Sequence, residues 1–252
     1  MISAVCTFDS LYKAADAVSA MRMLQIPLER CELLDESSVH AFNQYNATMG
    51  ATTTQQMNIQ PTLFLEFTGP SQSSVEEVVE ISKSVCMEDY DGSDFLFTAN
   101  EDDRRNLWLA RHQLYYASIN LRPGAKTAYV TDACVPLSQF PKVITDTAKI
   151  VKDLDLVGAC FGHAGDGNFH CILPVLDDDS AEYIDKIHTV NDNLIRNTID
   201  AGGTCTGEHG IGYGKIKYLQ KQFGTGGVTM MNMIKKSLDP LNIMNPGKVV
   251  II

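Results

Sequence analysis

The 252-residue sequence predicts an α+β fold, in which two ferredoxin-like (split βαβ) halves form one mainly antiparallel sheet. Short apolar, β-branched segments alternate with segments that have the helical period of about 3.6 residues. The strand and helix order of residues 1–99 recurs in 100–204, and no low-complexity linker separates the two halves. We therefore expect helices packed on one face of the sheet, followed by a C-terminal helical tail at 205–252.

The first half shows the clearest alternation of strands and helices. In 61–69, Leu63 and Leu65 would share one side of a strand. In 10–25, apolar residues recur at helical spacing behind Ser10, a typical N-cap. The strands expected here are 2–8, 30–36, 61–69 and 93–99, the helices are 10–25, 37–46 and 71–86, and the polar segment 52–60 is a loop.

The second half continues with similar segments, and the tail then differs from both halves. The expected strands are 127–136, 156–163 and 168–175, and the expected helices are 100–121, 137–154 and 179–202. In the tail, six glycines fall within 202–215, a helix at 223–240 is stopped by Pro240, and 241–252 is a short β-rich piece.

Net charge and composition exclude several classes of protein. The chain has 31 acidic and 20 basic residues, and its formal charge of −11 makes nucleic acid a poor partner. No apolar run approaches the roughly 20 residues that cross a bilayer. The seven cysteines form no CxxC pair and are expected to be reduced thiols. The N-terminus carries no targeting signal, so we expect either a cytosolic chain or one whose original N-terminus is missing.

The segment FGHAGDGNFH contains two histidines around a turn. Asp166-Gly167 is a preferred two-residue hairpin turn, which would place His163 opposite His170 with Cβ atoms about 4.5–5.5 Å apart. Asn168 would lie on the same face. Two imidazoles at that spacing can bind one cation, so the hairpin predicts two ligands of a metal site. The alternative is two half-buried histidines beside a glycine turn.

A second segment, GEHGIG at 207–212, places a carboxylate and a third histidine between glycines. Glu208 would complete a set of two histidines and one carboxylate, which leaves coordination positions open, as in catalytic metal sites. His209 would then be free to act as a base near neutral pH. The alternative is a solvated acidic turn.

The glycine-rich GIGYGK does not match a nucleotide-binding loop. Ile216 stands where the phosphate loop requires Ser or Thr, and His209 stands where it requires Gly. The glycine spacing also differs from GxGxxG. We therefore exclude both of these nucleotide-binding motifs.

Three motifs, GHAGDGNFH, CTGEHGIGYGK and LDPLNIMNPGK, occur in this order in one known family. On these motifs the chain resembles the C-terminal part of FAD-linked 2-hydroxy acid dehydrogenases of the vanillyl-alcohol oxidase type. Within that family it is most similar to the D-lactate dehydrogenase (cytochrome) branch. PTLFLEFTG, LWLARHQLYYA and TDACVP also match, so the resemblance covers nearly the whole chain. Ala164 is the single departure in the first motif, where the family often has Val.

The resemblance implies a role for seven residues. It implies that His163, His170 and Glu208 bind a divalent metal (Zn or Mn), that His209 is the general base, that Arg111 and Asn168 contact the substrate, and that Asn245 lies near the flavin. For Arg111 the alternative is an ordinary arginine on a helix surface.

The reaction implied by the resemblance is oxidation of a 2-hydroxy acid. D-lactate, oxidised to pyruvate, is the favoured substrate, and D-2-hydroxyglutarate is the alternative. The metal would chelate the substrate hydroxyl and carboxylate, His209 would take the hydroxyl proton, and hydride would pass to FAD. The resemblance also implies an electron acceptor such as cytochrome c and a mitochondrial location for the full-length family member.

In this family an N-terminal FAD-binding domain precedes the matching region, and nothing in residues 1–252 resembles it. We therefore expect 1–204 to be the substrate (cap) domain and 205–252 to return to the FAD domain. The chain alone would then bind FAD weakly and have little activity. The alternatives are a non-catalytic interaction module that keeps the cap fold, and a metal-dependent hydrolase, which would leave the NPGK tail without a role.

Overall fold

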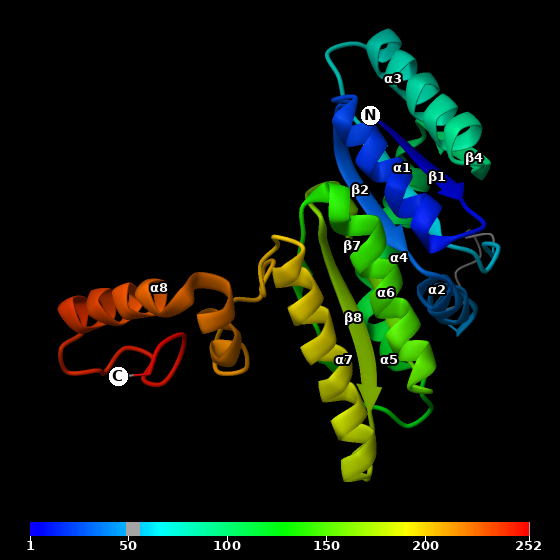
Figure 1. Ribbon diagram of the computed structural model, residues 1–252. Helices are drawn as coiled ribbons and strands as arrows, with labels where there is room; N and C mark the ends of the chain where they lie inside the picture. Colours follow the sequence, from blue (N-terminus) through cyan, green and yellow to red (C-terminus); the bar gives the residue numbers. More distant parts are fainter. Residues whose placement is uncertain (49–55, 252) are drawn as a thin grey trace.

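The computed structural model describes residues 1–48 and 56–251, and it confirms the α+β class and the antiparallel sheet (Figure 1). The expected loop at 52–60 lies partly outside these residues. The strands run antiparallel in the order β4-β1-β3-β2-β7-β8-β5, and β6 pairs with β8. Their bounds are β1 (Ile2–Thr7), β2 (Leu28–Leu34), β3 (Thr62–Phe67), β4 (Ser93–Thr98), β5 (Thr127–Val130), β6 (Ala133–Cys134), β7 (Ala159–His163) and β8 (Asn168–Val175).

The strand order shows how the two halves join. The order β4-β1-β3-β2 is that of a ferredoxin-like sheet. In the second half, β5, β8 and β7 take the places that β1, β3 and β2 have in the first half. The halves meet where β2 pairs with β7, in a register that places Glu32 opposite His163. This junction, which we call the seam, makes one continuous sheet and brings a residue of each half together.

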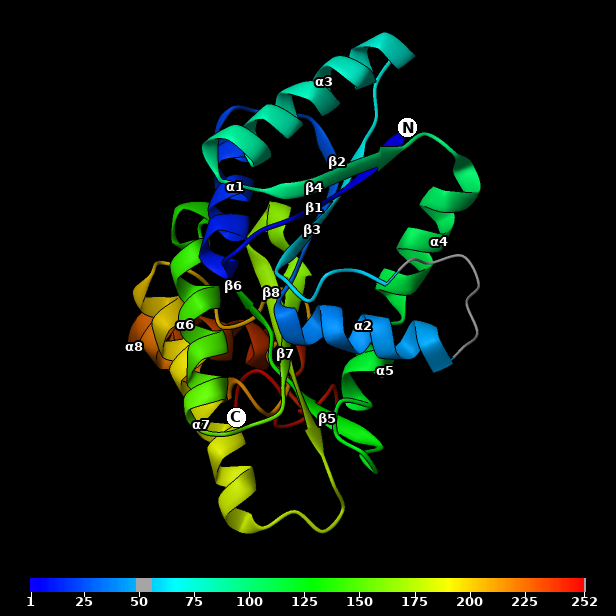
Figure 2. The ribbon, with the colours of Figure 1, turned by 90° about the vertical axis from the view of Figure 1, so that its right-hand side faces the viewer.

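Helices cover both faces of the sheet, rather than the single face expected from the sequence (Figure 2). The strand β3 is buried on both sides: Leu65 belongs to one apolar cluster and Phe64 to the other. One cluster includes α1, α3, α6 and α7, and the other includes α2, α4 and α5. The second layer forms because Phe64 and its neighbours also have to be shielded from water.

The helices begin at the caps that the sequence indicates. The side chain of Ser10 accepts the N–H of Lys13, and that of Ser71 accepts the N–H of Ser74. The single helix expected at 100–121 is divided, and the second part buries Leu114 against the sheet. The bounds are α1 (Leu11–Met23), α2 (Glu36–Thr48), α3 (Gln72–Ser84), η1 (Val85–Asp89), α4 (Glu101–His112), α5 (Leu114–Ile119), η2 (Leu137–Gln139), α6 (Phe140–Asp153), η3 (Ala164–Asp166), α7 (Ala181–Asp200) and α8 (Ile216–Leu238).

The tail contains α8, which projects away from the sheet (Figure 1). Its backbone is kinked at Gly224, where φ is 68°. The prediction of a β-rich piece at 241–252 is wrong, because the described residues there form turns. Asn242, Asn245 and Val249 have positive φ angles, which interrupt any extended segment.

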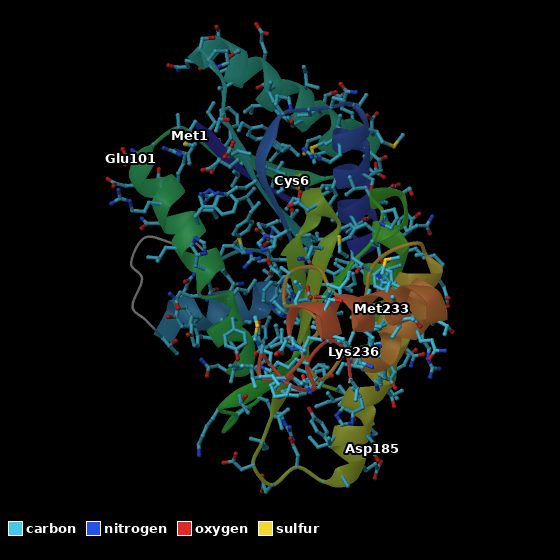
Figure 3. The ribbon with its side chains drawn as sticks, turned by 90° about the vertical axis from the view of Figure 1, so that its left-hand side faces the viewer. Met1, Cys6, Glu101, Asp185, Met233 and Lys236 are labelled. Carbon is cyan, nitrogen blue, oxygen red and sulfur yellow. The ribbon has the colours of Figure 1, made fainter. Side chains whose placement is uncertain are left out.

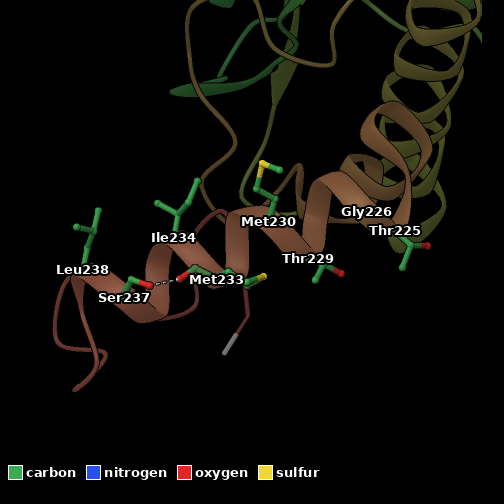
Figure 4. A pocket seen from close by; sticks show the side chains of 8 residues that line it. All are labelled: Thr225, Gly226, Thr229, Met230, Met233, Ile234, Ser237 and Leu238. Atoms are coloured by element: carbon green, nitrogen blue, oxygen red, sulfur yellow. Dashed lines mark hydrogen bonds between the residues drawn. The ribbon is translucent and has the colours of Figure 1, made fainter.

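The C-terminal part of α8 carries an exposed apolar patch. Met230, Met233, Ile234 and Leu238 are between 54% and 77% exposed and line an open pocket of about 640 Å³ (Figure 4). In Figure 3, Met233 and Lys236 mark α8 on the side that faces the viewer. An apolar patch of this kind is typical of a surface that contacts another protein or domain.

Two further features concern the thiols and the lengths of the helices. All seven cysteines are free thiols, and six of them are buried. Among the described residues, every helix is too short or too polar to span a bilayer.

Candidate metal centre

The hairpin of β7 and β8 differs in register from the expected one. Phe161 lies opposite His170, and the chain turns through η3 instead of a two-residue Asp166-Gly167 turn. Gly167 has a φ of 72°, and a Cβ there would lie 2.1 Å from the carbonyl oxygen of Val135, so the turn is fixed against the residue that follows β6. The register is offset by two residues, and an offset of two keeps every side chain on its original face. His163 and His170 therefore still meet, with ring centroids 6.3 Å apart.

His163 is oriented by a carboxylate across the seam. Its Nδ1 lies 2.6 Å from Oε1 of Glu32, which also pairs with Arg111. Burial alone would raise the pKa of Glu32, but its hydrogen bonds and the charges of His163 and Arg111 hold that pKa below its usual value. An ionised carboxylate only accepts hydrogen bonds, so Nδ1–H of His163 donates and Nε2 is left as the free ligand atom. The hydrogen bond to Glu32 also raises the pKa of His163.

His170 is held in the same tautomer by a different acceptor. Its Nδ1 donates to the carbonyl oxygen of Thr131 at 3.1 Å, which leaves Nε2 free. The ring is 7% exposed and stacks on His209 with centroids 4.8 Å apart. Burial lowers the pKa of His170, which favours the neutral imidazole that binds metals.

Glu208 faces both free imidazole nitrogens. Its Oε1 lies 3.0 Å from Nε2 of His170 and 3.8 Å from Nε2 of His163. The three donor atoms lie within 4.8 Å of one another, although they come from the hairpin and from a loop about forty residues later. Two imidazoles and one carboxylate are a donor set that zinc, manganese or iron can use, and they leave positions free for a substrate. The residues present therefore fit a divalent ion.

Asp132 fixes the loop that carries Glu208, and the sequence patterns assigned it no role. Its buried carboxylate accepts the backbone N–H groups of Gly207, Glu208 and His209 at 2.8–3.2 Å. Lys215 Nζ and the hydroxyl of Thr206 also donate to it. Burial would raise the pKa of Asp132, but these hydrogen bonds and the charge of Lys215 hold it well below its usual value.

Asp132, His170 and His209 form a second group that could in principle hold an ion. The carboxylate of Asp132 already accepts five donor groups, and Nδ1 of His170 donates to a carbonyl. Neither atom is available without breaking these bonds. The set of His163, His170 and Glu208 is therefore the better ligand set.

Arg111 and Asn168 lie beside this ligand set. The guanidinium of Arg111 donates to Glu32 at 2.7 Å, packs over the ring of Phe161 and leaves its buried Nε without a partner among the described residues. The side chain of Asn168 is also buried, and its Oδ1 has no hydrogen-bond partner in the part of the chain that the structure describes. A Cβ at Gly207 would lie 2.6 Å from this amide, so only glycine lets the loop approach it. An unpartnered buried amide oxygen at this point is available to a ligand.

His209 and Asn245 lie outside the ligand set. The imidazole of His209 is 45% exposed, and its Nε2 lies 3.8 Å from Oε1 of Glu208. Asn245 lies in the tail and lines a pocket of about 590 Å³ with Gly210, Gly212 and Met244. The structure thus brings six of the seven candidate residues to one centre and places Asn245 beside the glycine loop.

Glu32 and Asp132 could have been noticed in the sequence. Each is a charged residue within or next to an apolar strand, in RCELLDE and in AYVTDACVP. Charged residues are almost never fully buried unless they are paired. This signal marks both residues as partners of another group, although it does not identify the group.

Sequence and structure comparisons define the class of protein. Residues 1–249 match the family described as FAD linked oxidases, C-terminal domain, and the chain belongs to this family. It is 42% identical over 249 residues to "Probable D-lactate dehydrogenase, mitochondrial" of Danio rerio, covering 99% of this chain and 48% of that protein. It is 38% identical to "D-lactate dehydrogenase [cytochrome], mitochondrial" of Arabidopsis thaliana, covering 99% of this chain and 42% of that protein. The chain thus spans less than half the length of these relatives.

Solved structures share the fold. A 4-ethylphenol oxidase from Gulosibacter chungangensis superimposes with a TM-score of 0.69 at 17% identity, covering 99% of this chain and 53% of that one. A p-cresol methylhydroxylase superimposes with a TM-score of 0.65 at 14% identity, covering all of this chain and 53% of that one. At these identities the likeness shows the fold alone.

Proposed function

We propose that the chain is the substrate- and metal-binding part of an FAD-dependent D-2-hydroxy acid dehydrogenase that oxidises D-lactate to pyruvate. The observation that carries this proposal is that one donor atom of each of His163, His170 and Glu208 lies within 4.8 Å of the other two. Membership in the family of FAD-linked oxidases supports the redox class. Residues 1–204 would be the substrate domain, and 205–252 would return to the part that holds FAD.

The metal and the flavin would supply distinct chemistry. A divalent ion held by His163, His170 and Glu208 would orient a chelating 2-hydroxy acid and make its hydroxyl more acidic. FAD, when bound, supplies the hydride acceptor. Asn245, beside the glycine loop, is our candidate for contact with the flavin.

The remaining residues would act on the substrate directly. His209 lies against His170 and is exposed enough to accept the hydroxyl proton and pass it to water. Asn168 would donate or accept one hydrogen bond through its buried amide. Arg111 would attract the substrate carboxylate through the guanidinium edge that does not contact Glu32.

The names of the relatives support the substrate class. Both relatives described above are named for D-lactate, and a "Glycolate oxidase subunit GlcD" of Bacillus subtilis is 30% identical over 243 residues. Lactate and glycolate are both 2-hydroxy acids. D-lactate is our choice because its relatives are the more similar ones, and D-2-hydroxyglutarate is the alternative to be tested beside it.

The acceptor and the location are inferred from the same names. The Arabidopsis relative is named for cytochrome and for the mitochondrion, so we propose a cytochrome such as cytochrome c as acceptor and a mitochondrial location. The net charge of −11 is compatible with a basic acceptor protein.

Calorimetric titration of the chain with Mn²⁺ and Zn²⁺ tests the metal site. We expect one ion per chain, and loss of binding in His163→Ala, His170→Ala and Glu208→Gln. His209→Ala is the matched control, because this imidazole lies beside the ligands without belonging to them. Unchanged affinity in all three ligand variants would exclude the proposed metal site.

A further inference from the structure

Helix α4 carries two arginines, Arg104 and Arg111, seven residues apart. Each pairs with a buried glutamate of the sheet. Arg104 lies 3.5 Å from Glu66 on β3, and Arg111 lies 2.7 Å from Glu32 on β2. The two pairs are alike in residue type, helix and burial.

The two glutamates differ in one contact. Glu66 is bound by Arg30, Arg104 and the hydroxyl of Ser3, and its recorded partners include no histidine among the described residues. The two carboxylate oxygens of Glu32 have different partners: Oε2 accepts from Arg111, and Oε1 accepts from Nδ1 of His163 at 2.6 Å. Of these two pairs, the Glu32 pair is therefore the one that contacts the metal centre.

Glu32 is held in place through both oxygens of its carboxylate and through its backbone. Its residue is 6% exposed, and the ladder of β2 and β7 places it opposite His163. Arg111 is also largely buried, with its guanidinium over the ring of Phe161. The acceptor that faces Nδ1 of His163 is thus fixed in place.

We propose that Glu32 is the positioning residue of the metal centre, which holds His163 in the Nδ1–H tautomer with Nε2 directed at Glu208. Arg111 acts through Glu32 by fixing its carboxylate. This inference rests on the proposed function, and it adds a residue that binds neither metal nor substrate. A ligand imidazole that donates to a carboxylate binds metal more tightly, because its orientation is set and its basicity increases.

The two ligand histidines make the role of Glu32 specific. Nδ1 of His170 donates to the neutral carbonyl of Thr131, whereas Nδ1 of His163 donates to a charged carboxylate. Charge-assisted hydrogen bonds are about twice as strong as neutral ones. His163 is 42% exposed, so packing alone constrains its ring less than that of His170, which is 7% exposed.

The test compares Glu32→Gln with the matched control Glu66→Gln in the 252-residue chain. Calorimetric titration with Mn²⁺ should show affinity reduced by about 10–100-fold in Glu32→Gln and within about twofold of the original in Glu66→Gln. Glu32→Gln weakens one arginine pair and Glu66→Gln weakens two, so thermal unfolding should show the control destabilised at least as much as Glu32→Gln. Equal Mn²⁺ affinities in the two variants would overturn the proposal.

A second measurement separates this proposal from the proposed function. ¹⁵N NMR of histidine-labelled, metal-free chain at mildly alkaline pH reports which ring nitrogen of His163 carries the proton. We expect Nδ1–H in the unmodified chain and a mixture of tautomers in Glu32→Gln. An Nε2–H tautomer in the unmodified chain would refute the positioning role even if the variant does not fold. If the unmodified chain binds no metal while His163 shows Nδ1–H, the metal proposal fails and the orientation by Glu32 stands.

Discussion

Replacing Asp132 with Asn should release the loop that presents Glu208 and His209. The substitution keeps the shape of the side chain, removes its charge and turns one acceptor atom into a donor. In the protein the carboxylate of Asp132 accepts hydrogen bonds from the Thr206 hydroxyl and the Gly207 N–H at 2.7–2.8 Å. It also accepts from two further backbone N–H groups and from Nζ of Lys215 at 3.1–3.2 Å. The amide of the variant could satisfy only part of this set.

The magnitude follows from the burial of Asp132, whose side chain is 1% exposed, and of Lys215, whose side chain is 14% exposed. Removing one partner of a buried pair costs about 3–5 kcal/mol, because the other charge is left unpaired. We expect Asp132→Asn to lose about that much free energy of unfolding in urea. We also expect weaker Mn²⁺ binding, because Glu208 is no longer held.

The pH dependence gives the stricter check. The pKa of Asp132 is lowered in the folded protein, so its contribution is present above the unfolded value of about 3.9 and is lost as pH falls towards the folded value. The stability gap between the two chains should be constant from about pH 8 to pH 5 and shrink below about pH 4. A gap under about 1 kcal/mol, or one that grows on acidification, would refute the reasoning.

Asp35→Asn is the matched control, because Asp35 is a buried carboxylate that caps α2 away from the loop. Burial raises the pKa of Asp35 to about 6, above its unfolded value. The unmodified chain therefore gains stability as pH falls from about 6 to about 4, a gain that Asp35→Asn lacks. The gap for Asp35 should widen as pH falls from about 6 to about 4, whereas the gap for Asp132 should not widen in that interval, and Mn²⁺ affinity should not change.

Three further predictions concern the site. His209→Gln should keep Mn²⁺ affinity and reduce turnover of D-lactate by about 10²–10⁴-fold in an enzyme that contains FAD, and unchanged turnover would exclude His209 as the base. Gly207→Ala should lower the free energy of unfolding in urea by about 1–3 kcal/mol and weaken Mn²⁺ binding, because the new Cβ would lie 2.6 Å from the amide of Asn168. A variant as stable as the original would contradict this close approach. Mn²⁺ affinity should fall as pH falls, because Glu32 raises the pKa of His163, and a protonated imidazole cannot bind the ion. An Mn²⁺ affinity that does not change with pH would contradict this.

Sequence patterns predicted the elements that depend on local chemistry. Ser10 and Ser71 cap the helices expected behind them, and the alternating residues of 61–69 form β3. The shared face of His163 and His170 was also predicted, although through a register that is wrong by two residues. The error arose because the turn is fixed by Val135, a contact that the hairpin sequence does not contain.

The parts that could not be predicted depend on contacts between distant segments. Glu32 and His163 are 131 residues apart, and Asp132 and Glu208 are 76 residues apart. No periodicity in either segment indicates its partner. The second helical layer could not be predicted for a related reason: Phe64 lies between Leu63 and Leu65 and so faces the opposite side of the strand, but nothing local identifies α2, α4 and α5 as its cover.

The seam makes the orientation of His163 depend on the joining of the two halves. Both apolar clusters contain residues of both halves, and Glu32 meets His163 only when β2 and β7 pair. Closing the loop of 131 residues between Glu32 and His163 costs more conformational entropy than closing the shorter loops inside one half. Contacts of such long range also form slowly. The orientation of His163 therefore depends on a contact between residues 131 positions apart, whereas the hairpin that carries it joins neighbouring segments. An ion bound at the proposed site would then report that both halves have joined, and it would stabilise the joined state by mass action.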